Sequence, residues 1–378
     1  MLDYDILRFI WWALLGILLI GFAVLDGYDL GTAMLLPFVA RTDGERRQVR
    51  ETIEANWEGH QVWFVLGGGA SFAAWPMLYA ASFSGFYIAM FLVLLALILR
   101  PVGFNFRDKI ADPRWREAWD WALFVSGLVP ALVFGVAFGN LLLGVPFSLD
   151  GDLRLDYSGS FFGLLNPFAL LSGLVSVAML AMHGGIWLAG KADGEVADRA
   201  ARVASLAGLI AAGLFGLAGL WVAFGIEGYA IKSAIDHNGP SNPLAKNVAR
   251  DAGAWLANYG IHPWLALAPV LGFAAPLLAS LLAARRAAIP ALIASALGVA
   301  GIIATAGVSL FPFLLPSSIE PNASLTVWDA SSSRLTLFIM LISVVLLLPV
   351  VLAYTAFALR VMRGKVRLED IERHESQY

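Results

Sequence analysis

The chain has 378 residues, of which 59% are hydrophobic and 14% are charged, and its mean hydropathy is +0.75. Soluble domains carry roughly 25% charged residues, so this composition excludes an ordinary soluble protein and indicates an integral membrane protein. The absence of cysteine excludes disulfides, iron–sulfur clusters, thiolate zinc sites and covalently attached c-type haem. A net charge of −3 gives no indication of a nucleic-acid partner.

Apolar runs of about 20 residues, enough to cross a hydrocarbon core of roughly 30 Å, occur nine times. They are expected near residues 7–36, 58–75, 79–100, 118–142, 162–190, 202–225, 260–283, 287–311 and 335–360. The second is the least secure, because polar residues open it and three glycines lie inside it. The N-terminus MLDYDILRF lacks the basic leader and cleavage site of a signal peptide, so the first span should stay in the protein. We therefore predict an all-α integral membrane protein whose residues 1–378 form a single transmembrane domain.

Lys and Arg are distributed unevenly between the loops. Of the 25 Lys and Arg residues, 19 follow the odd-numbered spans and 6 lie elsewhere. Because cytoplasmic loops of membrane proteins carry an excess of these residues, we expect the N-terminus outside and the C-terminus in the cytoplasm. The longest connections, 226–259 and 312–334, then face outward, and their Pro, Asn, Ser and Gly residues indicate turns rather than strands.

Charged side chains gather where four expected spans reach the cytoplasmic side. Asp26 and Asp29 lie in the first span with apolar residues still to follow. Glu58 opens the second span, Arg100 ends the third and Asp120 opens the fourth. An ionisable group at mid-membrane costs on the order of 3 kcal/mol, so these groups should face protein or water rather than lipid.

Asp26 and Asp29 are three residues apart and therefore share one helix face. Two carboxylates that close resist joint ionisation, so the pair can hold and pass a proton, and Arg100 could keep the other acids ionised. A proton or ion pathway is the interpretation that we favour for this pair. The alternative is that charges at helix ends are caps and headgroup anchors, which suits Glu58 and Asp120 when each is considered alone.

Two histidines, His60 and His183, are considered as further members of the proton pathway or as haem ligands. His60 lies two residues after Glu58 and points to the opposite side of an ideal helix, so we leave it out of the pathway. His183 is the one histidine clearly within a span, and Met182 points about 100° away from it, so the two cannot share one iron. We expect His183 to be a hydrogen-bonded packing residue, and we expect no haem or metal ligand on this chain.

The run LGGGAS at residues 66–71 gives the second span a strip without side chains. Ordinary close helix packing is the plainer interpretation of this strip. The more specific alternative is an apolar passage for a small gas beside Trp63, which lies one helical turn before Gly67.

Five segments resemble subunit II of the cytochrome bd ubiquinol oxidases. In chain order they are LRFIWWALLGILLIGFAVLDGYDLG, NWEGHQVWFVLGGGASFAAWPMLYAASFSGFY, LRPVGFNFRDK, WREAWDWALF and FPFLLPSSIEPNASLTVWDASSS. The resemblance implies helical bundles plus one peripheral helix in a bacterial inner membrane. It also implies a partner subunit I that carries two b-type haems and haem d, oxidises quinol and reduces dioxygen to water. A structural quinone is associated with some members, and whether small single-helix accessory subunits join is left open.

The resemblance also implies roles for the charged residues, because subunit II is thought to help conduct cytoplasmic protons. The acidic positions of the first helix match Asp26 and Asp29, and the arginine of the third helix matches Arg100. The acid that follows a tryptophan matches Glu58, and the acid of the WDW segment matches Asp120.

The chain departs from the family pattern in two places. Glu58 and Asn105 stand where relatives carry aspartate. An amide cannot release a proton, so a route through this chain would pass around Asn105, through water.

An oxygen route passing near Trp63 is also associated with the family.

The expected function is therefore to scaffold the haem-bearing subunit and to conduct protons, with no catalytic residue on this chain. The alternatives are a proton-coupled secondary transporter and a purely structural membrane subunit.

Overall fold

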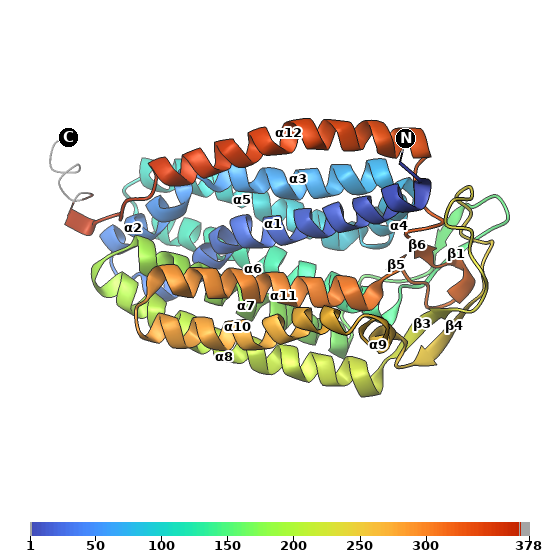
Figure 1. The fold of residues 1–378 in the computed structure, drawn as a ribbon. Coiled ribbons are helices and arrows are strands. Elements are labelled where there is room, and N and C mark those ends of the chain that lie inside the picture. Colours follow the sequence, from blue (N-terminus) through green and yellow to red (C-terminus); the bar gives the residue numbers. More distant parts are fainter. Residues whose placement is uncertain (1, 370, 372–378) are drawn as a thin grey trace.

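Long apolar helices run side by side along most of the molecule, and three small sheets lie together at one end (Figure 1). This computed structural model describes residues 2–369 and 371. Eight helices in that part of the chain are long and apolar enough to cross a membrane. The prediction of an all-α integral membrane protein is confirmed.

The long helices have the following bounds: α1 Tyr4–Val39, α3 Trp57–Ala74, α5 Tyr87–Phe106, α6 Pro113–Leu143, α7 Pro167–Lys191, α8 Gly194–Gly225, α10 Leu267–Ala284, α11 Ala288–Leu310 and α12 Arg334–Val361. The shorter α-helices are α2 Asp43–Glu54, α4 Pro76–Gly85 and α9 Ala257–Ile261. The short 3-10 helices are η1 Arg107–Lys109, η2 Phe162–Leu164, η3 Ala254–Leu256, η4 Pro263–Ala266 and η5 Pro321–Ala323.

Helix α3 corresponds to the second expected span. Its 18 residues give a length of about 27 Å, and it lies parallel to the long helices in Figure 1. It is not among the eight apolar helices, because its first turns, WEGHQ, lower its hydropathy. The count of nine spans therefore stays a prediction.

The third expected span, 79–100, is wrong at both of its ends. The chain forms the separate helix α4 and then begins α5 at Tyr87, after the single residue Phe86. Helix α5 continues to Phe106, so Arg100 lies inside it, more than one turn before its end. Packing in the folded chain, rather than hydropathy, decides where these helices break.

Helix α1 lies in the centre of the bundle and packs against α3, α6, α7 and α11. Its closest approach is to α7, where a Cβ atom at Gly31 would lie 2.0 Å from the carbonyl oxygen of Leu180. Only glycine permits that distance between the two backbones. Helix α12 lies at the edge of the bundle in Figure 1, with 6% of its most apolar stretch buried, which agrees with the expected peripheral helix.

The connections that were predicted to face outward contain strands as well as turns, so the expectation of turns alone is wrong. The antiparallel pairs are β1 Phe147–Leu149 with β2 Leu155–Tyr157, β3 Glu227–Ile231 with β4 Val248–Ala252, and β5 Phe313–Leu315 with β6 Leu325–Thr326. Strand β5 begins the segment that was expected to be a turn. All three of its residues are buried, so it pairs its backbone in a sheet while its side chains pack in the core.

Helix α2 lies at the opposite end of the bundle from the sheets (Figure 1). It begins with a capping box, in which the Thr42 side chain accepts from the N–H of Glu45 and the Glu45 carboxylate accepts from the N–H of Thr42. The sequence TDGE carries the signal for this helix start. The Glu45 carboxylate also accepts from Arg199 of α8 at 2.5 Å, so the contact fastens α2 to the bundle.

Candidate functional site

Two of the predicted residues, Asp26 and Arg100, form a fully buried ion pair between α1 and α5. The Nη1 of Arg100 donates to the Oδ1 of Asp26 at 2.6 Å, and both residues are 0% exposed. The guanidinium also lies 5.9 Å from the ring of Trp57. Arg100 thus contacts one of the acids with which the sequence analysis grouped it.

One turn further along α1, Asp29 pairs with His60 of α3. The Nδ1 of His60 lies 2.8 Å from the Oδ2 of Asp29, and the Nε2 of His60 lies 3.3 Å from the hydroxyl of Tyr28. All three side chains are buried. The ring of Tyr28 stacks on Trp187 of α7 at 4.0 Å, so the tyrosine itself is held in place.

The two pairs leave polar atoms with capacity for further hydrogen bonds. Among the described residues, Oδ2 of Asp26, Oδ1 of Asp29, and Nε and Nη2 of Arg100 have no hydrogen-bond partner. These atoms are two acceptors and two donors within one buried cluster. Because unpaired buried polar groups are costly, such a cluster is a place where water or a moving proton is favoured.

His60, rather than Glu58, faces the acids of α1, and this corrects the sequence analysis. Glu58 is exposed, and within the described part of the chain it forms no side-chain hydrogen bond or ion pair. The helical spacing correctly separated the directions of the two side chains, but it does not determine which side of α3 turns inward. The buried side of α3 carries Trp57, His60 and Trp63, so packing of these rings decides the rotation of the helix.

Asp120 lies in a second cluster, away from Asp26 and Asp29 in its contacts. It accepts from Nε of Arg107 at 2.6 Å and from Nη1 of Arg46 at 2.8 Å. It is also not a helix cap, because α6 begins at Pro113 and its N-cap is Asp112. Arg46 lies in α2 and Arg107 lies in η1, which follows α5. Asp120 therefore joins α6 to both of these elements.

The remaining predicted residues lie at the edges of the site. Asn105 is exposed, and its Nδ2 donates to the carbonyl oxygen of Pro101 at 2.8 Å, so it is directed away from the buried pairs. The ring of Trp63 is buried against α1, where a Cβ at Gly21 would lie 2.5 Å from it.

The three glycines of α3 do not serve helix packing within this chain. Side chains added at Gly67, Gly68 or Gly69 would meet no described atom within 4 Å. The close helix contact that the sequence suggested for this strip is therefore not made by another helix of the described chain.

The ring of His183 is fully engaged in hydrogen bonds, as expected for a packing residue. Its Nδ1 lies 2.7 Å from Oγ of Ser295, and its Nε2 donates to the carbonyl oxygen of Val24 at 2.9 Å. His60 likewise has a partner at each ring nitrogen. Neither buried histidine thus offers a free nitrogen to a haem iron, and the described residues contain no group of three or more potential metal ligands.

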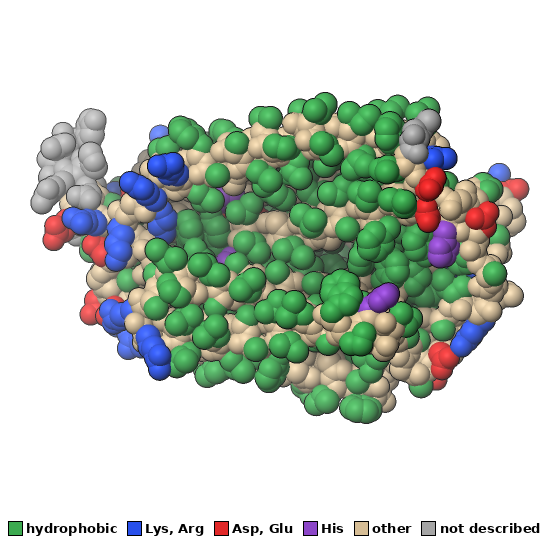
Figure 2. Space-filling model, in the orientation of Figure 1, with side chains coloured by type: hydrophobic (Ala, Val, Ile, Leu, Met, Phe, Trp, Pro, Cys, Tyr) green, Lys and Arg blue, Asp and Glu red, His purple; other side chains and the backbone are tan. Residues whose placement is uncertain are grey.

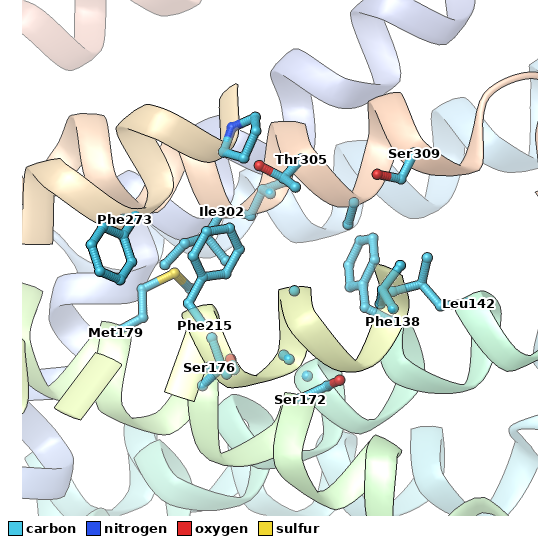
Figure 3. Close-up of a pocket in the computed structure, with 18 of the residues that line it drawn as sticks. Phe138, Leu142, Ser172, Ser176, Met179, Phe215, Phe273, Ile302, Thr305 and Ser309 are labelled. Carbon is cyan, nitrogen blue, oxygen red and sulfur yellow. The ribbon is translucent and has the colours of Figure 1, made fainter. Parts of the chain in front are cut away.

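A cavity of about 680 Å³ lies between α1, α3, α6, α7, α8, α10 and α11, toward the end that carries the sheets (Figure 3). Its walls are almost entirely apolar, and Phe138, Phe215 and Phe273 are among the side chains that line it (Figure 3). The few polar side chains include Ser176. This volume lies within the range of sites for small molecules, roughly 300–1,000 Å³.

Comparisons with known proteins identify relatives of this chain. The family profile described as cytochrome bd terminal oxidase subunit II matches residues 7–362. The chain is 53% identical over 374 residues to cytochrome bd-I ubiquinol oxidase subunit 2 of Escherichia coli (strain K12), with 99% of both chains covered. It is 49% identical over 375 residues to a probable cytochrome oxidase subunit 2 of Haemophilus influenzae, again with 99% of both covered.

A solved structure shares the fold. It is the bd oxidase from Geobacillus thermodenitrificans, of which one chain superposes with a TM-score of 0.69 at 16% identity, covering 94% of this chain and 98% of that one. The family match and the two sequence identities show that the chain belongs to the cytochrome bd terminal oxidase subunit II family.

Proposed function

We propose that this chain pairs with a haem-bearing subunit I in a bacterial inner membrane and conducts cytoplasmic protons to the site of oxygen reduction. As a member of its family it is subunit II of a bd-type quinol oxidase, an oxidoreductase. The name of the Escherichia coli relative favours ubiquinol as the electron donor. The two b-type haems and haem d belong to the partner subunit in this proposal.

The buried pairs Asp26–Arg100 and Asp29–His60 carry the proposal. Four ionisable side chains from α1, α3 and α5 meet where at most 3% of each residue is exposed. Burying an ionisable group costs several kcal/mol unless it is paired, so a purely structural subunit gains little from such a cluster. The unpartnered acceptor and donor atoms beside the pairs are what a chain of proton transfers requires.

Glu58 and Asp120 take outer roles in the same proposal. Glu58 is exposed two residues before His60 on α3, so it can collect a proton at the surface of this chain. Asp120 is held by Arg107 and Arg46, which suits a fixed negative charge near the entrance rather than a proton carrier. Asn105 is exposed and needs no place in the route.

The test is the rate of oxygen consumption by the purified complex with excess quinol. Asp29→Asn should reduce the rate on the order of 100-fold, because proton transfer by a positioned group contributes about that much, and Asp26→Asn should also reduce it. The haem spectrum of both variants should stay normal. Asp152→Asn, a change at an exposed acid of the β1–β2 loop, is the control. Full turnover in both the Asp26 and Asp29 variants would favour a purely structural subunit.

The apolar cavity supports a structural quinone. Its volume, its phenylalanine-rich walls and its few polar side chains suit an isoprenoid quinone. Replacing Ser176 by Phe should fill the space, whereas Ser176→Ala keeps it open. Extraction of the purified complexes and quantification by mass spectrometry should find quinone lost from the first variant and retained in the second. Equal quinone content in both would assign the quinone to another place.

An oxygen route beside Trp63 is part of the proposal, because apolar side chains connect this tryptophan with the cavity. Trp63 packs in the same hydrophobic cluster as Phe22 and Phe64, and both phenylalanines line the cavity. A small apolar gas therefore meets no charged group between the cavity and this tryptophan.

A further inference from the structure

The two buried pairs differ in their capacity to exchange a proton. Arg100 stays protonated at any pH that a protein tolerates, so its 2.6 Å contact with Asp26 joins two charges. Protonating Asp26 would leave the guanidinium buried without a counter-charge. The Asp26–Arg100 pair therefore holds charge and resists proton exchange.

The Asp29–His60 pair has the opposite property. A carboxylate and an imidazole can each bind a proton, so one proton can lie on either side of the 2.8 Å contact. When two groups interact this closely, the proton belongs to the pair rather than to one residue.

The net charge of the cluster sets how many protons the second pair holds. The charges of Asp26 and Arg100 cancel. The Asp29–His60 pair has a net charge of −1 when the carboxylate is ionised and the imidazole is neutral, 0 after one proton is added and +1 after two are added. An uncompensated charge in a buried place is costly, so the state with one proton is favoured. Releasing that proton leaves a negative charge, which draws the next proton in.

Tyr28 fixes the ring of His60. Its hydroxyl lies 3.3 Å from Nε2 while Trp187 holds the phenol ring by stacking at 4.0 Å. Among the described residues, Tyr28 and Asp29 of α1 contact His60, and Asp26 of α1 and Arg100 of α5 act electrostatically on Asp29. His183 of α7 lies beyond Tyr28, at 6.1 Å between the two rings. Glu58 on the same helix is exposed.

We propose that Asp29 and His60 together hold the exchangeable proton of this site, that Tyr28 is a positioning residue for the histidine, and that Asp26–Arg100 is a fixed pair that exchanges none. This inference rests on the proton-conducting function proposed above and assigns the carrier within it. It differs from the expectation that Asp26 and Asp29 share the proton between themselves.

The experiment is infrared difference spectroscopy of the purified complex during a pH change, with ¹⁵N-labelled histidine to identify ring bands. In the wild type, a histidine ring band and a carboxyl band should change together at one pH. His60→Asn and Asp29→Asn should each abolish this paired change. Tyr28→Phe should keep it but move its midpoint.

Two control variants complete the test. The double variant Asp26→Asn, Arg100→Gln leaves the site without an unpaired buried charge and should retain the paired change. His183→Asn removes the other buried histidine and should retain it as well. A paired change that survives His60→Asn, or one that disappears in the double variant while the haem spectrum stays normal, would overturn the inference. The infrared spectra test which residues hold the exchangeable proton, whereas oxygen consumption by Asp29→Asn tests whether the chain conducts protons. Either hypothesis can therefore be refuted without the other.

Discussion

At the scale of single residues, charged side chains in this protein act through their particular partners. Asp120 and Asp26 are both buried acids that bind arginine, yet Asp120 contacts two arginines near the end of the bundle that carries α2, whereas Asp26 contacts one inside it. Arg107 also reaches Asp43 of α2 at 2.8 Å, so the cluster around Asp120 ties α2 to α6. The same residue type therefore fastens helices in one cluster and balances charge in the other.

Glu45 gives a prediction at this scale, because its stabilising contacts need an ionised carboxylate. Burial alone would raise the pKa of Glu45, but hydrogen bonds from the N–H of Arg41 and from Arg199 outweigh burial and hold the pKa below its usual range. Its contribution to stability is therefore fully present above the unfolded pKa of about 4.3 and is lost as the pH falls through the folded value.

Glu45→Gln should lower the free energy of unfolding by about 2 kcal/mol at pH 7, the worth of a hydrogen bond between charged groups. The difference from the wild type should shrink below about pH 4. Thermal unfolding of the complex at both pH values measures this. Glu195→Gln is the control, because Glu195 contacts the same Arg199 at 3.5 Å but its side chain is 75% exposed. A difference that stays constant down to low pH would refute the ionisation argument.

At the scale of elements, the contact of α1 with α7 positions the site. Tyr28 of α1 stacks on Trp187 of α7, and the Thr32 hydroxyl donates to the carbonyl oxygen of Gly184 at 3.2 Å. These contacts depend on the close approach of the two backbones at Gly31. The face of α1 that carries Asp26 and Asp29 is therefore set by a glycine contact.

Gly31→Ala should force α1 away from α7, because the added Cβ would meet backbone atoms that cannot move aside. A cost of about 1–3 kcal/mol is typical of overpacking. The measurement is the thermal midpoint of the purified complex together with its yield. Gly16→Ala on the same helix is the matched control, since a Cβ there meets nothing within 4 Å. Equal loss of stability in both variants would show that the close approach at Gly31 is not responsible, because helix propensity alone favours alanine over glycine.

At the scale of the whole molecule, the two ends of the bundle differ in charge. Figure 2 shows Lys and Arg gathered at the end that carries α2 and the last described residues, while the sheets occupy the other end. This distribution supports the predicted orientation, with the sheets outside and α2 in the cytoplasm. In that orientation Arg46, Arg107 and Asp120 lie on the side from which protons would enter.

The absence of cysteine from the chain allows a direct test of orientation. Gly151 lies in the β1–β2 loop and Gly364 lies after α12, and both are exposed with no atom within 4 Å of an added Cβ. In intact spheroplasts, a membrane-impermeant maleimide should label Gly151→Cys and should leave Gly364→Cys unlabelled until the membrane is opened. The opposite labelling pattern would reverse the proposed direction of proton entry.

The sequence by itself determined the membrane character, the approximate position of most long helices and the presence of Asp26, Asp29 and Arg100 away from lipid. Hydropathy and the cost of burying charge are properties of the chain, so they can be evaluated without coordinates. Helix α2 is also predictable from the sequence, because the residues of its capping box, Thr42 and Glu45, can be recognised there.

Only the tertiary structure decided which partner each charged group finds. Helical periodicity fixes the angle between Glu58 and His60, but the rotation of α3 against α1 decides that His60 meets Asp29. Asp120 likewise finds Arg46 and Arg107 through contacts between separate elements, and the apolar cavity has walls from seven long helices. Such contacts depend on how whole helices pack, which no local pattern of residues specifies.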